Sequence, residues 1–96
     1  MKVSVITVTY NSIDTLQDCI DSVLMQTYSN IEHVIIDGNS TDGTISLIKK
    51  NSIKKWISEP DKGLYYAMNK GIEIATGDIV GILNSDDIYA NKYVIE

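Results

Sequence analysis

The chain has 96 residues, of which 44% are hydrophobic and 22% charged, and it carries a net charge of −5 with eight Lys and no Arg. This length allows one small domain, and the composition excludes disordered and fibrous proteins. The lysines are dispersed and outnumbered by acidic residues, so a nucleic-acid partner bound through a basic surface is not expected.

The first predicted element is a strand over Lys2–Thr9, where β-branched residues predominate and both faces can be buried. It ends at Tyr10, after which Asn11 or Ser12 can cap a helix that runs to about Met25. The apolar positions of this helix follow the three-and-four spacing of one buried face: Ile13, Leu16, Ile20, Val23 and Leu24.

A second strand is predicted over Ile31–Ile36. It is followed by Asp37–Thr44, a segment without an aliphatic side chain, and such loops are exposed and often functional. Thr41 or Asp42 can then begin a second helix, Thr44 to about Asn51.

A short third strand is predicted over Ile53–Ile57 and is broken by Pro60. A third helix over Leu64–Ala75 ends before Gly77 and carries a stripe of small residues that would let it lie close to a sheet. A fourth strand, Asp78–Leu83, leads into the acidic pair Asp86-Asp87.

The alternation of strands and helices with short connections predicts an α/β fold, a Rossmann-like, mostly parallel sheet with helices on both faces. Polar residues follow the first, second and fourth strands, and in a parallel sheet these positions meet at one edge. Side-chain chemistry predicts that Tyr10 stacks on a base, that Asp37 accepts hydrogen bonds from a base or ribose, and that Asp86 and Asp87 hold ribose hydroxyls and a metal. The alternative for the acidic pair is an ordinary polar turn.

Two adjacent carboxylates repel each other unless a cation lies beside them, and a hard divalent ion is the usual partner. The chain has no glycine-rich phosphate-binding motif and no Arg, so a metal is expected to neutralise a bound diphosphate.

Five segments together resemble family 2 glycosyltransferases: V-S-V-I-T-V-T-Y-N at 3–11, D-G-N-S-T-D-G-T at 37–44, G-L-Y-Y-A-M-N-K-G at 63–71, A-T-G-D at 75–78 and L-N-S-D-D at 83–87. Each motif alone is weak, but five in this order and spacing are specific. The resemblance implies a GT-A fold, a nucleotide-diphosphate sugar donor with UDP favoured, Mg2+ or Mn2+, and inverting transfer to an acceptor hydroxyl in glycan or polysaccharide biosynthesis.

Carried over position by position, the resemblance implies that nucleotide-binding residues are Thr9, Tyr10, Asn11, Asp37 and Asp86. Asp87 is implied to be the direct metal ligand, with Asp86 beside it. The chain departs from the family at Asn84, where the first acid of the D-x-D motif is expected, at Gly38, where many members have a second acid, and at Tyr66, where relatives often have Asp.

Members of that family continue beyond the D-x-D strand into an acceptor-binding part that supplies the general base. We therefore expect residues 1–96 to form a single nucleotide-sugar-binding domain, the N-terminal part of a longer enzyme, with the general base outside it and no sugar transfer by this part alone. The implied partners are a nucleotide-sugar donor and a glycan, lipid-linked or other hydroxyl acceptor, and an uncovered sheet edge would favour a homodimer.

Two alternatives remain at the level of sequence. A nucleotidyltransferase shares the Rossmann-like core and the metal but normally has a glycine-rich basic loop, and a non-catalytic sugar-nucleotide or metal-binding module would need no base. The lone Cys19 favours a reducing compartment, and no apolar run approaches the roughly 20 residues that cross a bilayer. We expect a cytoplasmic protein, at most peripheral to the cytoplasmic face of the membrane.

Overall fold

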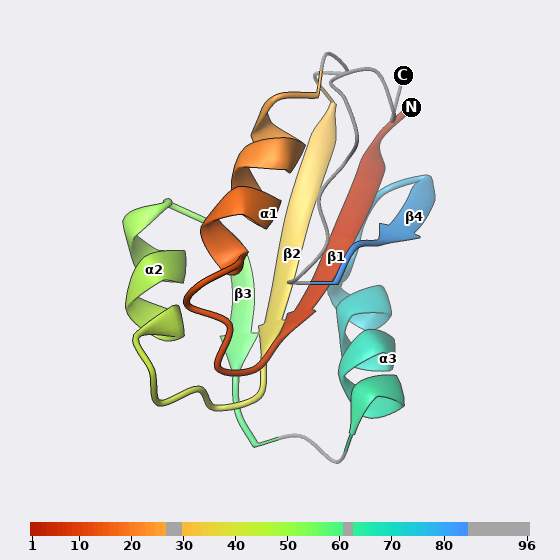
Figure 1. Ribbon diagram of the computed structural model, residues 1–96. Coiled ribbons are helices and arrows are strands. Elements are labelled where there is room, and N and C mark those ends of the chain that lie inside the picture. Colours follow the sequence, from red (N-terminus) through yellow and green to blue (C-terminus); the bar gives the residue numbers. More distant parts are fainter. Residues whose placement is uncertain (27–29, 61–62, 85–96) are drawn as a thin grey trace.

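A computed structural model describes residues 1–26, 30–60 and 63–84, which form a four-stranded sheet in the order β3-β2-β1-β4 (Figure 1). All three strand pairs are parallel. The strands are β1 (Val3–Thr9), β2 (Ile31–Asp37), β3 (Lys55–Ser58) and β4 (Ile79–Ile82). The helices are α1 (Leu16–Leu24), α2 (Thr44–Lys50) and α3 (Leu64–Ile74). The predicted order of elements is confirmed, with boundaries shifted by a few residues.

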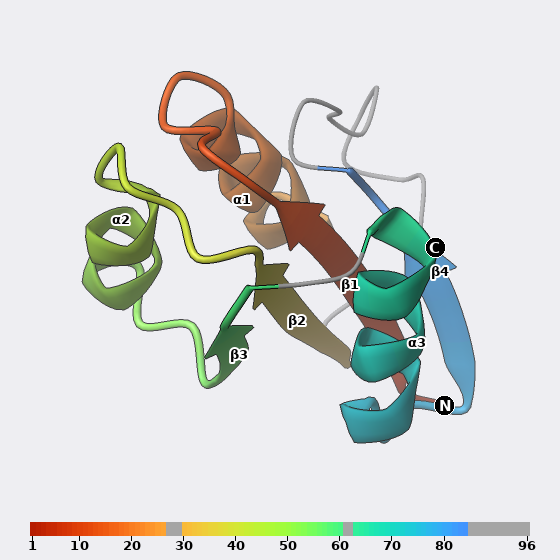
Figure 2. The same cartoon turned by 90° about the horizontal axis from the view of Figure 1, so that it is seen from below.

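The helices cover both faces of the sheet, as predicted. Figure 2 shows α1 and α2 on one face and α3 on the other. Leu16 and Ile20 of α1 pack with Ile35 of β2 and Ile48 of α2 on the first face. Ala67 of α3 packs in a second core cluster on the opposite face, whose other buried members are Ile6, Val34 and Ile36. The fold is therefore the α/β, Rossmann-like sheet that the sequence predicts.

Helix α3 lies close to the sheet because a glycine faces β1. A Cβ placed on Gly71 would lie 2.5 Å from Cγ2 of the buried Ile6 side chain. Ala67, one turn earlier, is fully buried in the same contact layer. The small-residue stripe thus serves packing, as its spacing predicts.

Strand β4 is the exposed edge of the sheet. Ile79, Val80 and Ile82 are 50%, 41% and 42% exposed, whereas the central strands β1 and β2 are largely buried. The predicted homodimer would use such an edge, but it stays a prediction. No helix of the described residues is long and apolar enough to span a membrane.

Helix α1 begins later than predicted, at Leu16 and not near Asn11. The backbone N–H groups of Ser12 and Ile13 are taken by the loop after β2, where they donate to Thr44 Oγ1 (3.1 Å) and Asp42 Oδ2 (3.1 Å). The expected capping residues are therefore engaged with a neighbouring loop. As a result, Ile13 is 37% exposed, and its predicted place on the buried face of the helix is wrong.

The other end of α1 also corrects the predicted buried face. Leu24 is 71% exposed, while Leu16, Ile20 and Val23 are buried. Helix α2 begins at Thr44 as predicted, with Gly43 in a left-handed conformation (φ 99°) before it. That conformation suits a glycine, because a Cβ there would be strained.

Candidate functional site

Three strand ends lie level at the carboxyl edge of the sheet. Thr9 at the end of β1 is in register with Asp37 at the end of β2, and Asp37 is in register with Ser58 at the end of β3. Paired residues of parallel strands share a face, so these polar side chains form one row across the sheet. This is the edge where ligands of open α/β sheets bind.

The loops after β1 and β2 are joined to each other by hydrogen bonds. The Asn11 backbone N–H donates to Ser40 Oγ (2.8 Å), and the Thr41 N–H donates to Asn11 Oδ1 (2.8 Å). Gly38 N–H donates to the Thr9 carbonyl (2.9 Å). Asn11 adopts a positive φ of 47°, a conformation that Asn tolerates better than most residues. The structure thus brings the two predicted nucleotide-binding loops together as one unit.

Asp37 is the centre of this unit and is fully buried. Its Oδ2 accepts hydrogen bonds from the Ser40 N–H (2.9 Å) and the Ser58 hydroxyl (2.7 Å), and its Oδ1 accepts one from the Ser40 hydroxyl (2.5 Å). All three donors are neutral. Sequence motifs indicated Asp37 but not Ser58, which the parallel pairing of β2 and β3 brings to it.

Thr9 and Tyr10 offer unused groups at the same edge. Thr9 is 1% exposed, and its hydroxyl has no hydrogen-bond partner among the residues that the structure describes. Buried hydroxyls normally have a partner, so this one is available to a ligand that reaches the strand end. Tyr10 is 63% exposed, which leaves its ring free for stacking.

Asp42 organises the loop before α2. Its Oδ1 accepts hydrogen bonds from the Thr44 hydroxyl (2.5 Å) and the Thr44 N–H (3.1 Å). The Thr44 hydroxyl, followed by backbone N–H groups including that of Ile13, holds the pKa of the Asp42 carboxyl below its ordinary value. Asp42 therefore stays ionised and bonds Thr44, the first residue of α2, but the N-cap position itself is Gly43 and not Asp42 as the sequence suggests.

The predicted metal ligands Asp86 and Asp87 lie outside the described residues. Within residues 1–26, 30–60 and 63–84, no group of three His, Cys, Asp or Glu side chains could hold a metal ion. The structure describes the segment that leads to this pair, up to Asn84. Strand β4 runs parallel to β1, and after it the Leu83 N–H donates to the Ile6 carbonyl (2.9 Å). The next residue, Asn84, stands where the D-x-D motif has its first acid, and it is exposed. The metal site itself stays a prediction.

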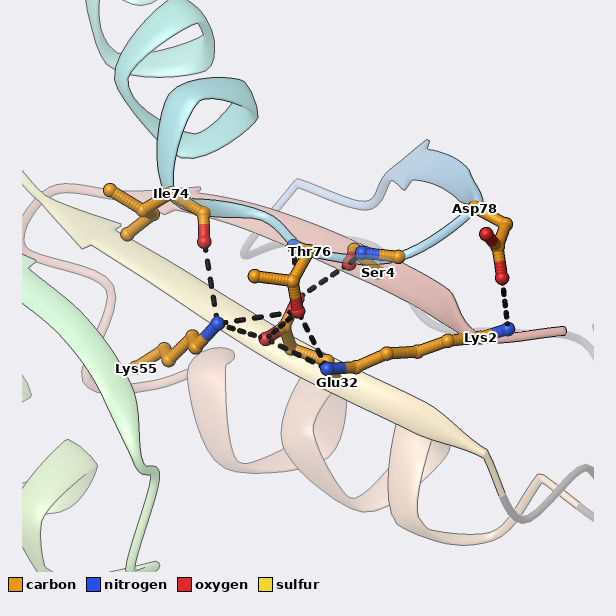
Figure 3. Close-up of polar contacts among 8 residues, drawn as sticks. Lys2, Ser4, Glu32, Lys55, Ile74, Thr76 and Asp78 are labelled. Carbon is orange, nitrogen blue, oxygen red and sulfur yellow. Dashed lines mark hydrogen bonds and ion pairs between the residues drawn. The ribbon is translucent and has the colours of Figure 1, made fainter.

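A second polar cluster, which the sequence did not indicate, lies at the opposite end of the strands (Figure 3). The Glu32 side chain is 8% exposed and pairs with Lys55 and with Lys2 (3.5 Å). It also accepts hydrogen bonds from Ser4 Oγ (2.6 Å) and from Thr76 N–H (2.9 Å). Burial would raise the pKa of Glu32, but the bonds from Lys55, Ser4 and Thr76 outweigh it and hold the pKa well below its usual range.

His33 lies between the two ends of the sheet, on the face that α1 covers. Its Nε2 is 2.7 Å from the Thr7 hydroxyl, which in turn lies 3.8 Å from Cys19 Sγ. Burial lowers the pKa of His33 to about 4, so the ring is neutral at pH 7. No signal in the sequence assigns His33 a functional role, and its contacts are those of a packed core residue.

The sequence is similar to known glycosyltransferases over nearly its whole length. A family model described as Glycosyl transferase family 2 matches residues 4–96. The uncharacterized glycosyltransferase Rv1514c of Mycobacterium tuberculosis is 42% identical over 96 residues, which cover 97% of this chain and 37% of that protein. Glycosyltransferase GlyA of Streptococcus pneumoniae is 35% identical over 97 residues, which cover 97% of this chain and 14% of that protein. The chain thus spans well under half the length of these relatives.

Two solved structures share the fold and have nucleotide sugars bound. The mannosyltransferase PcManGT from Pyrobaculum calidifontis, in complex with GDP-Man and Mn2+, superposes with a TM-score of 0.87 at 29% identity, over 95% of this chain and 29% of that one. S. aureus TarS 1–349 with UDP-GlcNAc gives a TM-score of 0.87 at 31% identity, over 96% of this chain and 28% of that one.

Proposed function

Because the chain belongs to glycosyl transferase family 2, we propose that it forms the donor-binding part of an enzyme that transfers a sugar from a nucleotide diphosphate to an acceptor hydroxyl. The observation that carries this proposal is the union of the loops after β1 and β2 at the carboxyl edge of the sheet. Asp37, Thr9 and Tyr10 meet there, in the place where open α/β sheets bind ligands. A nucleotide bound at this edge would contact all three of these side chains.

Each group has a distinct task in this proposal. The exposed Tyr10 ring stacks on the base. The Thr9 hydroxyl, which has no hydrogen-bond partner in the part of the chain that the structure describes, donates to the base or ribose. Asp37, already oriented by three hydrogen bonds, accepts one more from the nucleoside. Asn11 holds the two loops together through Ser40 and Thr41. UDP is the proposed nucleotide, in line with the UDP-GlcNAc found in TarS.

Asp87, with Asp86 beside it, is the proposed ligand of Mg2+ or Mn2+. The Mn2+ in the PcManGT complex and the absence of Arg from this chain support a divalent ion at this position. Such an ion, when bound, neutralises the diphosphate and makes it a better leaving group. Transfer with inversion, in glycan or polysaccharide biosynthesis, completes the proposal, with a general base outside these residues. We place this reaction in the cytoplasm.

Calorimetric titration of UDP into the chain, with and without Mn2+, tests the proposal. We expect binding that depends on Mn2+ and that Asp87→Ala abolishes. Asp18→Ala, an exposed acid on α1, is the matched control and should bind as the unaltered chain does. Binding that ignores both Mn2+ and Asp87→Ala would contradict the metal-dependent donor site. It would leave the acidic pair as an ordinary polar turn.

A further inference from the structure

The Asp37 carboxylate is held from two sides by serine hydroxyls of different origin. Ser40 belongs to the loop that follows Asp37, whereas Ser58 is the last residue of β3 and reaches Oδ2 at 2.7 Å. Ser58 lies inside the region that the family model matches but outside the five motifs on which the sequence resemblance was recognised. We propose that Ser58 is a positioning residue, which fixes the Asp37 carboxylate for its contact with the nucleoside; this inference rests on the proposed function.

The anchor from β3 differs from the one in the loop. Asp37 and Ser58 are paired in the sheet, and the Glu59 N–H donates to the Asp37 carbonyl (3.0 Å), so Ser58 is tied to the backbone of Asp37 itself. Ser40, three residues after Asp37, belongs instead to the loop that follows β2. Asp37 is fully buried, so a nucleoside can reach it only if that loop yields. The bond from Ser58 is the one that persists through such a displacement.

The hydrogen bonds also determine which oxygen is presented. Each carboxylate oxygen accepts about two hydrogen bonds. Oδ2 already accepts two, from Ser40 N–H and Ser58 Oγ, while Oδ1 accepts one, from Ser40 Oγ. Among the described residues, the remaining acceptor position is therefore on Oδ1, and a displacement of the Ser40 loop would free Oδ1 further while Ser58 still held Oδ2. Without the Ser58 hydroxyl, Oδ2 would also have a vacant position, and the carboxylate could turn about its terminal torsion.

The test compares UDP affinity in the presence of Mn2+ for the unaltered chain, Ser58→Ala and Ser58→Thr. Ser58→Ala is expected to weaken UDP binding about tenfold, a size typical for loss of a hydrogen bond that orients a ligating group. Ser58→Thr keeps the hydroxyl and should bind within about twofold of the unaltered chain, which a purely structural effect of altering this position would not predict. Ser46→Ala, an exposed serine on α2, is the matched control.

Thermal unfolding of each variant shows whether it is folded at the titration temperature. If Ser58→Ala binds UDP as the unaltered chain does, Ser58 does not position Asp37. An equal loss of UDP affinity in Ser58→Ala and Ser58→Thr would also overturn the inference, because the loss would then not depend on the hydroxyl. If the unaltered chain itself binds no UDP with Mn2+, the proposed function fails and this inference fails with it.

Discussion

Glu32 at the amino end of the sheet has cationic partners, whereas Asp37 and Asp42 at the carboxyl end are bonded by neutral groups. At the amino end, Glu32 is paired with Lys2 and Lys55, so the charge is neutralised within the protein. At the carboxyl end, Asp37 and Asp42 receive hydrogen bonds from hydroxyls and backbone N–H groups and have no lysine partner among the described residues. Glu59, which follows β3 at this same end, does pair with Lys70, so the carboxylates without a cationic partner among the described residues there are those of Asp37 and Asp42.

This difference separates a structural cluster from a candidate binding site. A buried carboxylate paired with cations has no need of a ligand, and removing it should cost stability. Carboxylates held only by neutral donors leave a negative edge that attracts a cation, in agreement with the divalent ion proposed beside Asp87. The Thr9 hydroxyl is buried at this edge and has no partner within residues 1–26, 30–60 and 63–84, as expected of a group that the proposed ligand would bind.

Replacement of Glu32 should have the largest effect and should affect stability alone. Glu32→Ala removes the partner of two lysines and the acceptor for Ser4 and Thr76, so we expect a loss of about 3 kcal/mol in the free energy of unfolding. Urea denaturation at pH 7 measures the loss, with Glu73→Ala, an exposed acid on α3, as control. UDP affinity should not change, and a parallel loss of affinity in the folded variant would remove the distinction between the two ends.

Acidification should have the next largest effect, through His33. Because burial lowers the pKa of His33 to about 4 from an ordinary value of 6.5, the unfolded chain takes up a proton first, and stability falls as the pH falls from 6.5 towards 4. The full shift corresponds to about 3 kcal/mol, of which we expect about 2 kcal/mol to be lost between pH 6.5 and 4.5.

Urea denaturation of the unaltered chain and of His33→Gln over this pH range measures the His33 contribution. The pH dependence between 6.5 and 4.5 should largely disappear in His33→Gln. The depressed pKa of Glu32 acts in a lower window, because its contribution is fully present above the ordinary value of 4.5 and is lost below it. An unchanged slope above pH 4.5 in His33→Gln would show that His33 is not the titrating group.

Substitution of Asn11 should have the smallest effect on stability and a clear effect on binding. Asn11→Gly keeps the left-handed backbone but loses the bond from the Thr41 N–H to Oδ1, so we expect about 1 kcal/mol of destabilisation. UDP affinity should fall because the two loops are no longer held together. Denaturation and calorimetry on the same sample test both, with Asn69→Ala on the exposed side of α3 as control. Intact UDP affinity would mean that this bond does not organise the site.

The site was only partly predictable from the sequence. The residues at the ends of the first two predicted strands, or just after them, are Thr9, Tyr10, Asn11 and Asp37, and the rule for parallel sheets correctly placed them at one edge. Their mutual bonds could not be predicted, because the Asn11 backbone N–H and the Ser40 hydroxyl are 29 residues apart in sequence and meet only when β1 and β2 pair. For the same reason the start of α1 was predicted too early, since Ser12 and Ile13 donate to the neighbouring loop.

Local pattern was sufficient for the order of elements, the parallel α/β class and the close approach of α3, because periodicity, β-branched content and small residues act within a few positions of the chain. The tertiary structure alone decided which carboxylates are neutralised and which are not. Glu32 and Asp37 both lie on β2, yet Glu32 meets Lys2, just before β1, and Lys55 of β3, whereas Asp37 meets serines. Apart from Ser40, the partners of Glu32 and Asp37 are 21 to 30 residues away from them in sequence. Whether such distant groups meet depends on strand order and register, which no local pattern encodes.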